Sequence, residues 1–311
     1  MRLDRLLAIL LLVICLVATV GNWIVGTSLR NAGQRPADIA LIDVYGGIGD
    51  AASSGPFGSS GGASANTLLE SIQKARKDKV KAILLRINSP GGTAAASQSV
   101  NHELMRVRKE TNIKIVASLG DVAASGGYYI ASAAHHIVAN PSTLTGSIGV
   151  IIRTQNVGSL LEKLGVQSGT VQSGQYKDIL SPFRSTTADE RQLIQGIVSD
   201  SYEQFLASIV EGRSIALPEL RKLADGRIFT GSQAKTAKLV DSLGNYQDAV
   251  QQTTQMIGLK KEPSIRNYTN GGSGSLLGKL LPFLSGSSNS SYGGNVPTTV
   301  NWDKVPLALM E

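Results

Sequence analysis

The residues best placed to do chemistry in this 311-residue chain lie in the glycine-rich stretch 119–130, around Ser125. The apolar run 113–117 before it predicts a buried strand, and the composition of 128–134 after it predicts a helix. Ser125 would then lie at a strand-to-helix turn, where helix N–H groups favour negative charge on oxygen. That position suits a nucleophile, although a serine that merely caps a helix would have the same surroundings.

Candidate bases for this serine are few, because the chain has three histidines. His135 and His136 lie about 15 Å further along the helix predicted after Ser125, at 1.5 Å per residue, and cannot easily reach it. His102 lies on another predicted helix and is expected to be a surface or packing residue. Lysine is the other recognised partner of a serine nucleophile, and Lys177 follows a predicted strand among apolar neighbours. A solvated loop lysine would have the same local sequence.

Composition excludes several classes of protein. The net charge of +7 is spread as isolated Lys and Arg, without the basic runs and interleaved aromatic residues of nucleic-acid grooves, so no nucleic-acid partner is expected. Cys15 is the single cysteine, so neither an intrachain disulfide nor a cysteine metal site can form. Three histidines also argue against an imidazole zinc site. We therefore expect no metal and no cofactor.

The N-terminus predicts a membrane anchor. Residues 6–26 carry no charge and are long enough to cross a bilayer as a helix, and Arg2 and Arg5 before them favour a cytoplasmic N-terminus. The apolar run is also longer than that of a cleaved signal peptide. The chain then divides into an anchor and linker at 1–36, a catalytic domain at 37–258, and a Gly- and Ser-rich, loosely ordered tail at 259–311.

Between the two ends, apolar strands alternate with amphipathic helices, which predicts an α/β fold with a largely parallel sheet. Glycine or proline clusters follow the strands, where α/β folds place ligands. Thr187 and Glu190 form a capping box that opens the clearest helix, expected to be a core helix that stops at Gly212. The predicted strands are 39–45, 80–87, 113–117, 137–139, 148–152 and 169–173, and the earlier predicted helices are 65–77, 93–107, 128–134 and 159–164.

Five short motifs carry a family resemblance. They are NSPGG at 88–92, DVAASGGYY at 121–129, TGSIG at 145–149, SGQYKD at 173–178 and DGRIFTG at 225–231. In this order they closely resemble the short form of bacterial signal peptide peptidase A, over about residues 39–256. Only the pairing of Ser-Pro-Gly-Gly with a later Ala-Ser-Gly-Gly is shared more loosely, with the Clp proteases and crotonases of the same fold superfamily.

The resemblance implies a membrane-anchored serine peptidase with a Ser-Lys dyad, on the Clp protease/crotonase-like fold of repeated ββα units. Carried over motif by motif, Ser125 is the nucleophile and Lys177 is the general base. Ser147 supplies a hydroxyl that orients the amine of Lys177. Such a dyad works without histidine, because the neutral lysine amine takes the proton of the serine hydroxyl.

Four glycines are expected to surround this dyad. The N–H groups of Gly92 and Gly126 would form the oxyanion hole, and Gly91 and Gly127 would bind substrate. The implied substrates are released signal peptides and other extended apolar peptides, since a glycine-lined cleft can pair with a peptide backbone but offers few charges.

The resemblance also implies a location and an assembly. The catalytic domain would lie outside the cytoplasm, in a ring-shaped homo-oligomer for which an octamer is one candidate size. Each site would join Ser125 of one protomer to Lys177 of its neighbour.

From the residues alone, two other functions stay open. A crotonase-like enzyme would use the same glycine-rich loops to hold a thioester oxyanion, although the loop at Gly120 offers mainly Asp121 as an acid or base. A membrane-anchored scaffold of the stomatin kind would assemble rings without catalysis. Ser125 and Lys177 would then have no chemical role.

Overall fold

The computed structural model describes residues 36–50 and 62–269. The predicted anchor at 6–26 lies outside these ranges, as does the predicted tail beyond residue 269. In the described residues, no helix combines the length and the apolar character needed to cross a membrane.

The described part of the chain folds around a mixed sheet of eight strands, as expected for an α/β fold. Six strands run parallel in the order β10-β1-β4-β5-β6-β9. β7 pairs with the C-terminal end of β5, and β8 lies antiparallel to β7. The bounds are β1 Ile39–Tyr45, β4 Ala82–Ser89, β5 Lys114–Ala124, β6 His136–Ala139, β7 Leu144–Gly146, β8 Ile228–Thr230, β9 Ser242–Leu243 and β10 Ile265–Asn267, with β2 Ile48–Gly49 and β3 Ala63–Ser64 in a separate pair.

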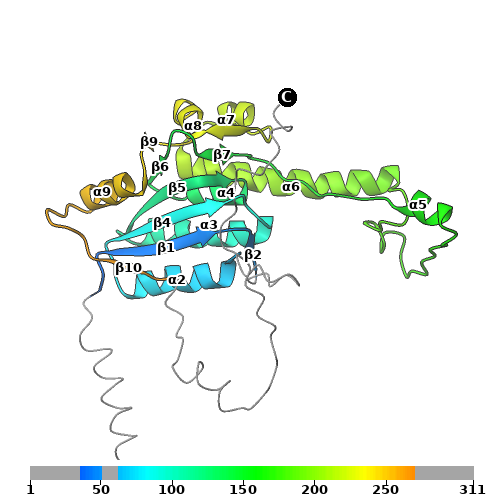
Figure 1. Cartoon of the computed structure of the whole chain (residues 1–311), viewed down its shortest axis with the longest axis horizontal. Helices are drawn as coiled ribbons and strands as arrows, with labels where there is room; N and C mark the ends of the chain where they lie inside the picture. The colour runs from blue at the N-terminus through cyan, green and yellow to red at the C-terminus, as the bar shows by residue number, and fades with distance from the viewer. Residues whose placement is uncertain (1–35, 51–61, 270–311) are drawn as a thin grey trace, which may run out of the picture. The chain divides into compact units, whose positions relative to one another are not determined.

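Helices pack on both faces of this sheet (Figure 1). Successive strand residues point to opposite faces, so Ile42 lies in the larger core with residues of α2, α3 and α4, whereas Ile39 and Leu84 pack against α9. The helices are α2 Ala65–Lys77, α3 Ala94–Glu110, α4 Gly126–Ala131, α5 Gly158–Lys163, α6 Ala188–Arg213, α7 Leu217–Leu223, α8 Gly231–Thr236 and α9 Tyr246–Met256.

Two predicted strands are wrong. Residues 148–152 and 169–173 form no strand, because their β-branched side chains find no partner strand in the described ranges. Ile151 is 72% exposed and Val171 is fully exposed. The strand present in this region is β7, and pairing with β5 on one side and β8 on the other holds its small residues extended.

The sheet also runs past the boundary expected at Gly258. β10 pairs parallel with β1, with Ile39 opposite Ile265. The Tyr268 N–H then donates to the Leu41 carbonyl at 2.9 Å, and the Tyr268 side chain is buried. The ordered domain therefore includes residues first expected in the tail.

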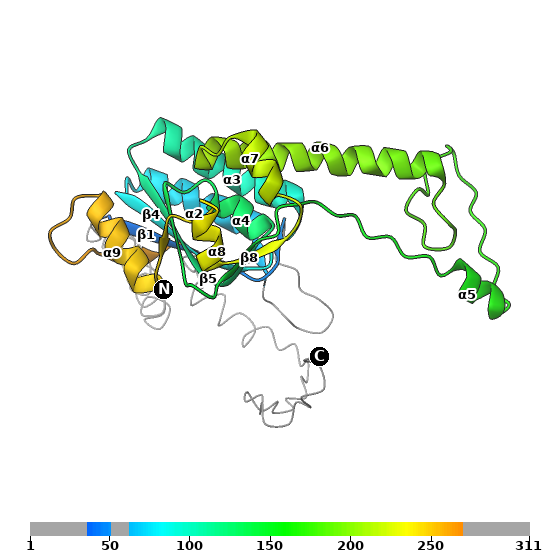
Figure 2. The ribbon, with the colours of Figure 1, turned by 90° about the horizontal axis from the view of Figure 1, so that it is seen from above.

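α6 begins at the predicted capping box but is only half a core helix. Thr187 and Glu190 make both bonds of the box. The second half of the helix buries Phe205 and Ile209, whereas Ile197 in the first half is 59% exposed. Both views show this first half running away from the sheet, with α5 beyond its end (Figures 1 and 2).

Gly212 is not the stop that its residue type suggested. The helix continues to Arg213 and ends at Ser214, which adopts the left-handed conformation. Gly212 is instead a packing residue, since a Cβ there would lie 2.1 Å from the Ser132 carbonyl oxygen.

Candidate active site

Ser125 lies at the turn between β5 and α4, in a backbone conformation that is rare for a residue with a side chain. Its φ is 51° and its ψ is −118°. The Ser125 N–H donates to the Gly146 carbonyl at 2.8 Å, and the Ser125 carbonyl accepts from the Tyr129 N–H at 2.8 Å. These two bonds hold a strained residue between β7 and the first turn of α4, and such strain is concentrated at functional sites.

Two glycine loops meet at this turn. A Cβ on Gly91 would lie 2.7 Å from the Gly126 nitrogen and 2.9 Å from the Ser125 Cβ. A Cβ on Gly126 would lie 2.3 Å from the Ser97 Oγ and 3.1 Å from the Gly92 nitrogen. Glycine is therefore required by close approach, which brings the loops 88–92 and 121–129 into contact.

Two N–H groups in these loops have no partner in the described structure. The bridge between Ile48 and Gly92 uses the Gly91 carbonyl at 2.9 Å and the Thr93 N–H at 2.9 Å, which leaves the Gly92 N–H free. Gly126 is the first residue of α4, so its N–H has no intrahelical acceptor. Unpaired N–H groups at a helix start can bind an anionic oxygen.

A pocket of about 430 Å³ opens beside Ser125. Gly92, Ser97 and Gly126 line its polar part. Its apolar lining comes from distant segments, namely Ile48, Ala94, Tyr129, Val150, Ile151 and Phe205. Sequence reasoning missed these lining residues, because Phe205 was expected only as a core position and Tyr129 only as part of a family motif.

The structure brings some of the predicted site residues together and leaves one apart. Gly91, Gly92, Gly126 and Gly127 surround Ser125 in the two loops. Ser147 is close in the fold, since it follows Gly146, the strand partner of Ala124; its φ is 48° and its N–H donates to the Arg227 carbonyl at 2.8 Å.

Lys177 is the residue that lies apart. It is exposed, in a turn closed by its own N–H to the Gly174 carbonyl at 3.1 Å. It is not among the residues that line the pocket beside Ser125.

The histidines lie away from Ser125. His135 accepts a 3.0 Å hydrogen bond from the Ile115 N–H at the start of β5, whereas Ser125 follows the opposite end of that strand. Burial, with the nearby Arg108 and Lys114, lowers the pKa of His135 to about 4. His136 Nε2 lies 2.9 Å from the Ser242 Oγ, and burial lowers its pKa too.

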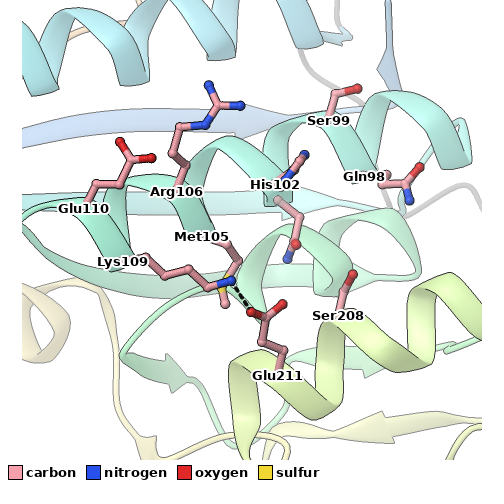
Figure 3. A pocket seen from close by; sticks show the side chains of 10 residues that line it. Gln98, Ser99, His102, Met105, Arg106, Lys109, Glu110, Ser208 and Glu211 are labelled. Atoms are coloured by element: carbon pink, nitrogen blue, oxygen red, sulfur yellow. Dashed lines mark ion pairs between the residues drawn. The ribbon is translucent and has the colours of Figure 1, made fainter.

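His102 lines a different pocket, of about 450 Å³, between α3 and α6 (Figure 3). The positively charged side chains that line this pocket form ion pairs. Lys109 pairs with Glu211 across the pocket, and Arg106 pairs with Glu103 at 3.0 Å. The lysine and the arginine that line this pocket therefore each have a carboxylate partner. In the described ranges, no group of His, Cys, Asp and Glu is arranged to hold a metal ion.

Comparisons with known proteins identify a peptidase family. The model of peptidase family S49 matches residues 107–260, which include Ser125, Ser147 and Lys177. "Putative protease slr0021" of Synechocystis sp. is 42% identical over 66% of this chain and 78% of its own length. "Putative signal peptide peptidase SppA" of Enterococcus faecium is 37% identical over 76% of this chain and 67% of its own length. "Protease 4" of Salmonella typhi is 37% identical over 75% of this chain but only 37% of its own length.

Proposed function

The chain belongs to peptidase family S49 and is a serine peptidase, and from this premise we propose that Ser125 is its nucleophile and Lys177 its general base. The observation that carries the proposal is the strained turn at Ser125, which lies between two unpaired N–H groups at the mouth of a pocket. The side chain of Ser125 makes no capping hydrogen bond to α4. A role as a helix cap therefore does not account for this serine.

In the first step, the neutral amine of Lys177 takes the proton of the Ser125 hydroxyl while Oγ attacks the scissile carbonyl carbon. The carbonyl oxygen becomes an oxyanion that accepts hydrogen bonds from the Gly92 and Gly126 N–H groups, each contributing roughly 3–4 kcal/mol by analogy with other proteases. The scissile C–N bond then breaks as the ammonium gives its proton to the leaving amine, which leaves an acyl ester on Ser125. A water, deprotonated by the same lysine amine, attacks this ester, and the C–O bond to Ser125 breaks as its Oγ takes the proton back. Ser147 orients the amine.

The substrates are extended apolar peptides, including released signal peptides. The proposal is supported by the apolar side chains of Tyr129, Ile151 and Phe205 in the pocket and by the glycine backbone around Ser125. A crotonase would need an acid or base at these loops, and the exposed Asp121 accepts a hydrogen bond from Asn88 at 3.2 Å outside the pocket.

Lys177 acts on the Ser125 of a neighbouring protomer in a ring-shaped homo-oligomer on the Clp protease/crotonase-like fold. The absence of Lys177 from the pocket lining of its own chain supports this arrangement. So do large apolar side chains exposed between β7 and the first half of α6, because a surface of this kind marks an interface. They include Ile151, Leu160, Leu164, Val171, Phe183 and Ile197.

The same proposal includes membrane attachment. The uncharged run at 6–26 would anchor the ring and leave the catalytic domain outside the cytoplasm. Peptides released into the bilayer would then meet the sites at a short distance.

A fluorophosphonate probe tests the nucleophile on the full-length protein in detergent. Ser125→Ala should abolish labelling, whereas Ser99→Ala should leave it unchanged, because Ser99 is an exposed serine on α3 that donates to the Ala95 carbonyl at 2.9 Å. Unchanged labelling of the Ser125→Ala variant would reject the assignment.

A further inference from the structure

A planar cation joins the turn that carries Lys177 to the start of α6. Arg184 binds Asp178, the residue after Lys177, through Nε to Oδ2 at 2.9 Å and Nη2 to Oδ1 at 2.6 Å. The same guanidinium reaches Glu190 through Nη1 to Oε2 at 2.8 Å and Nη2 to Oε1 at 2.5 Å. Both contacts use two hydrogen bonds, the geometry that fixes an arginine and a carboxylate most firmly.

Glu190 is itself held in place. Its side chain is 3% exposed, and Oε2 also accepts the Thr187 N–H at 2.8 Å as half of the capping box. The other half is the Glu190 N–H, which donates to the Thr187 Oγ1 at 3.3 Å. Because this carboxylate cannot move without breaking the helix cap, it gives Arg184 a fixed attachment to α6.

The turn around Lys177 has few other restraints. Its backbone bonds are short-range, such as the Ser181 N–H to the Asp178 carbonyl at 2.8 Å, and residues 172–177 are exposed. Two longer-range bonds close the segment, from the Val157 N–H to the Pro182 carbonyl at 2.7 Å and from the Asn156 Nδ2 to the Ser185 Oγ at 3.0 Å. These bonds lead to the start of α5, whereas the guanidinium of Arg184 ties the turn to α6.

We propose that Arg184 is a positioning residue, which holds Lys177 at a set place relative to α6 so that its amine reaches the Ser125 of the neighbouring protomer. The proposal rests on the proposed role of Lys177 as the base. α6 acts as a spacer: Glu190 and Phe205, whose ring lies at the pocket, are separated by about 22 Å at 1.5 Å per residue. The contacts of Arg184 with Asp178 and Glu190 hold the Lys177 turn at the start of α6.

The ion pairs between Arg184 and its two carboxylates persist at the neutral and alkaline pH at which a lysine can act as a base. Hydrogen bonding to Arg184 lowers the pKa of Glu190 to about 2 and also lowers the pKa of Asp178. Both carboxylates thus stay ionised at neutral and alkaline pH. The two ion pairs are present throughout that range.

The test compares Arg184→Ala with Arg221→Ala in the full-length protein. Arg221 on α7 is a matched control. It makes a bidentate pair with Glu203 of α6, at 2.8 and 2.6 Å, away from Lys177. A misplaced catalytic group costs on the order of 100-fold in rate, so Arg184→Ala should lower kcat by about 100-fold with KM within about 3-fold. Arg221→Ala should change neither by more than about 3-fold.

Two further measurements separate positioning from folding. Free guanidinium chloride at tens of millimolar should restore part of the kcat of Arg184→Ala and none of that of Lys177→Ala. Asp178→Asn keeps the shape of the side chain and the Glu190 contact, and should lower kcat by about 10-fold with an unchanged Tm. The proposal is overturned if Arg184→Ala keeps a kcat within about 3-fold, or if the Asp178→Asn variant does so. Full activity of Lys177→Ala would instead reject the dyad itself.

Discussion

The ring of Phe205 on α6 stacks on the ring of Tyr129 on α4, with centroids 4.3 Å apart and planes 7° apart. Tyr129 lies one turn after Ser125, so this pair connects the long helix to the wall of the pocket. The Tyr129 hydroxyl also accepts a hydrogen bond from the Ser208 Oγ at 3.0 Å. The size of the pocket therefore depends on a contact between two helices.

Phe205→Leu should make the enzyme accept peptides with larger side chains. The smaller residue loses the stacking, worth about 1 kcal/mol, and leaves space beside Tyr129. We expect kcat/KM for peptides with Phe to rise relative to those with Ala or Leu by about 10-fold, within the range of a hydrophobic pocket. A peptide panel measures the ratio, and an unchanged ratio would place the specificity elsewhere.

Gly126→Ala should abolish hydrolysis. Its Cβ would lie 2.3 Å from the Ser97 Oγ and would displace the N–H proposed to bind the oxyanion. The loss should reach about 100-fold or more in kcat. Adding Ser97→Ala removes that oxygen and should restore part of the rate. Gly196→Ala is the control: nothing lies within 4 Å of its Cβ, and it should raise stability by about 0.5–1 kcal/mol because alanine favours a helix.

Mixing two inactive variants tests the shared site. Ser125→Ala and Lys177→Ala should each lose activity by several orders of magnitude. In a randomly mixed ring, an intact Ser125 meets an intact neighbouring Lys177 at roughly one quarter of the interfaces, so activity should return to about that fraction. If both groups came from one chain, every site would lack a partner and the mixture would stay inactive. Co-expression with two affinity tags verifies the mixing.

Hydrolysis should increase from acidic to alkaline pH, because a lysine base acts only as the neutral amine. The kcat/KM profile of the full-length protein measures this. A rate maximum well below pH 6 would contradict a lysine base.

Stability should fall on acidification partly through His135. Its pKa is about 4 when folded against about 6.5 when unfolded, so the unfolded chain binds the extra proton between these values. Stability is complete above pH 6.5 and is lost as the pH falls towards 4, by roughly 1–2 kcal/mol after allowance for partial solvent exposure. His135→Gln should flatten this slope in urea unfolding at pH 7 and pH 5. An identical slope in both proteins would assign the loss to other groups.

Strong local patterns were enough to predict part of the fold. The strand at 39–45 and the helix at 65–77 have the predicted bounds. The apolar run of the strand and the apolar face of the helix can each be recognised from the residues of that segment alone. β7 could not be predicted from Leu144–Gly146, since its extended form depends on Ala124 and on β8 from far along the chain. Residues 148–152 have the composition of a strand without a neighbour to pair with.

For the proposed site, the motifs pointed to Ser125 and to glycines that the fold brings close to it. They gave no indication that Phe205 would line the pocket. A phenylalanine suits both a core position against Tyr129 and a pocket wall, so its residue type does not distinguish the two. Arg184 was missed for a similar reason. Its partners Asp178 and Glu190 are each six residues away, and the turn that brings them together has no sequence signature.

The first half of α6 separates the two ends of the proposed chemistry within a chain. Glu190, which Arg184 joins to the Lys177 turn, and Phe205 at the pocket of Ser125 lie about 22 Å apart on one helix. Under the proposed dyad, a newly made protomer is then inactive until it assembles with another. Activity would depend on the local concentration of protomers, and it would rise faster than in proportion to expression while protomers are scarce.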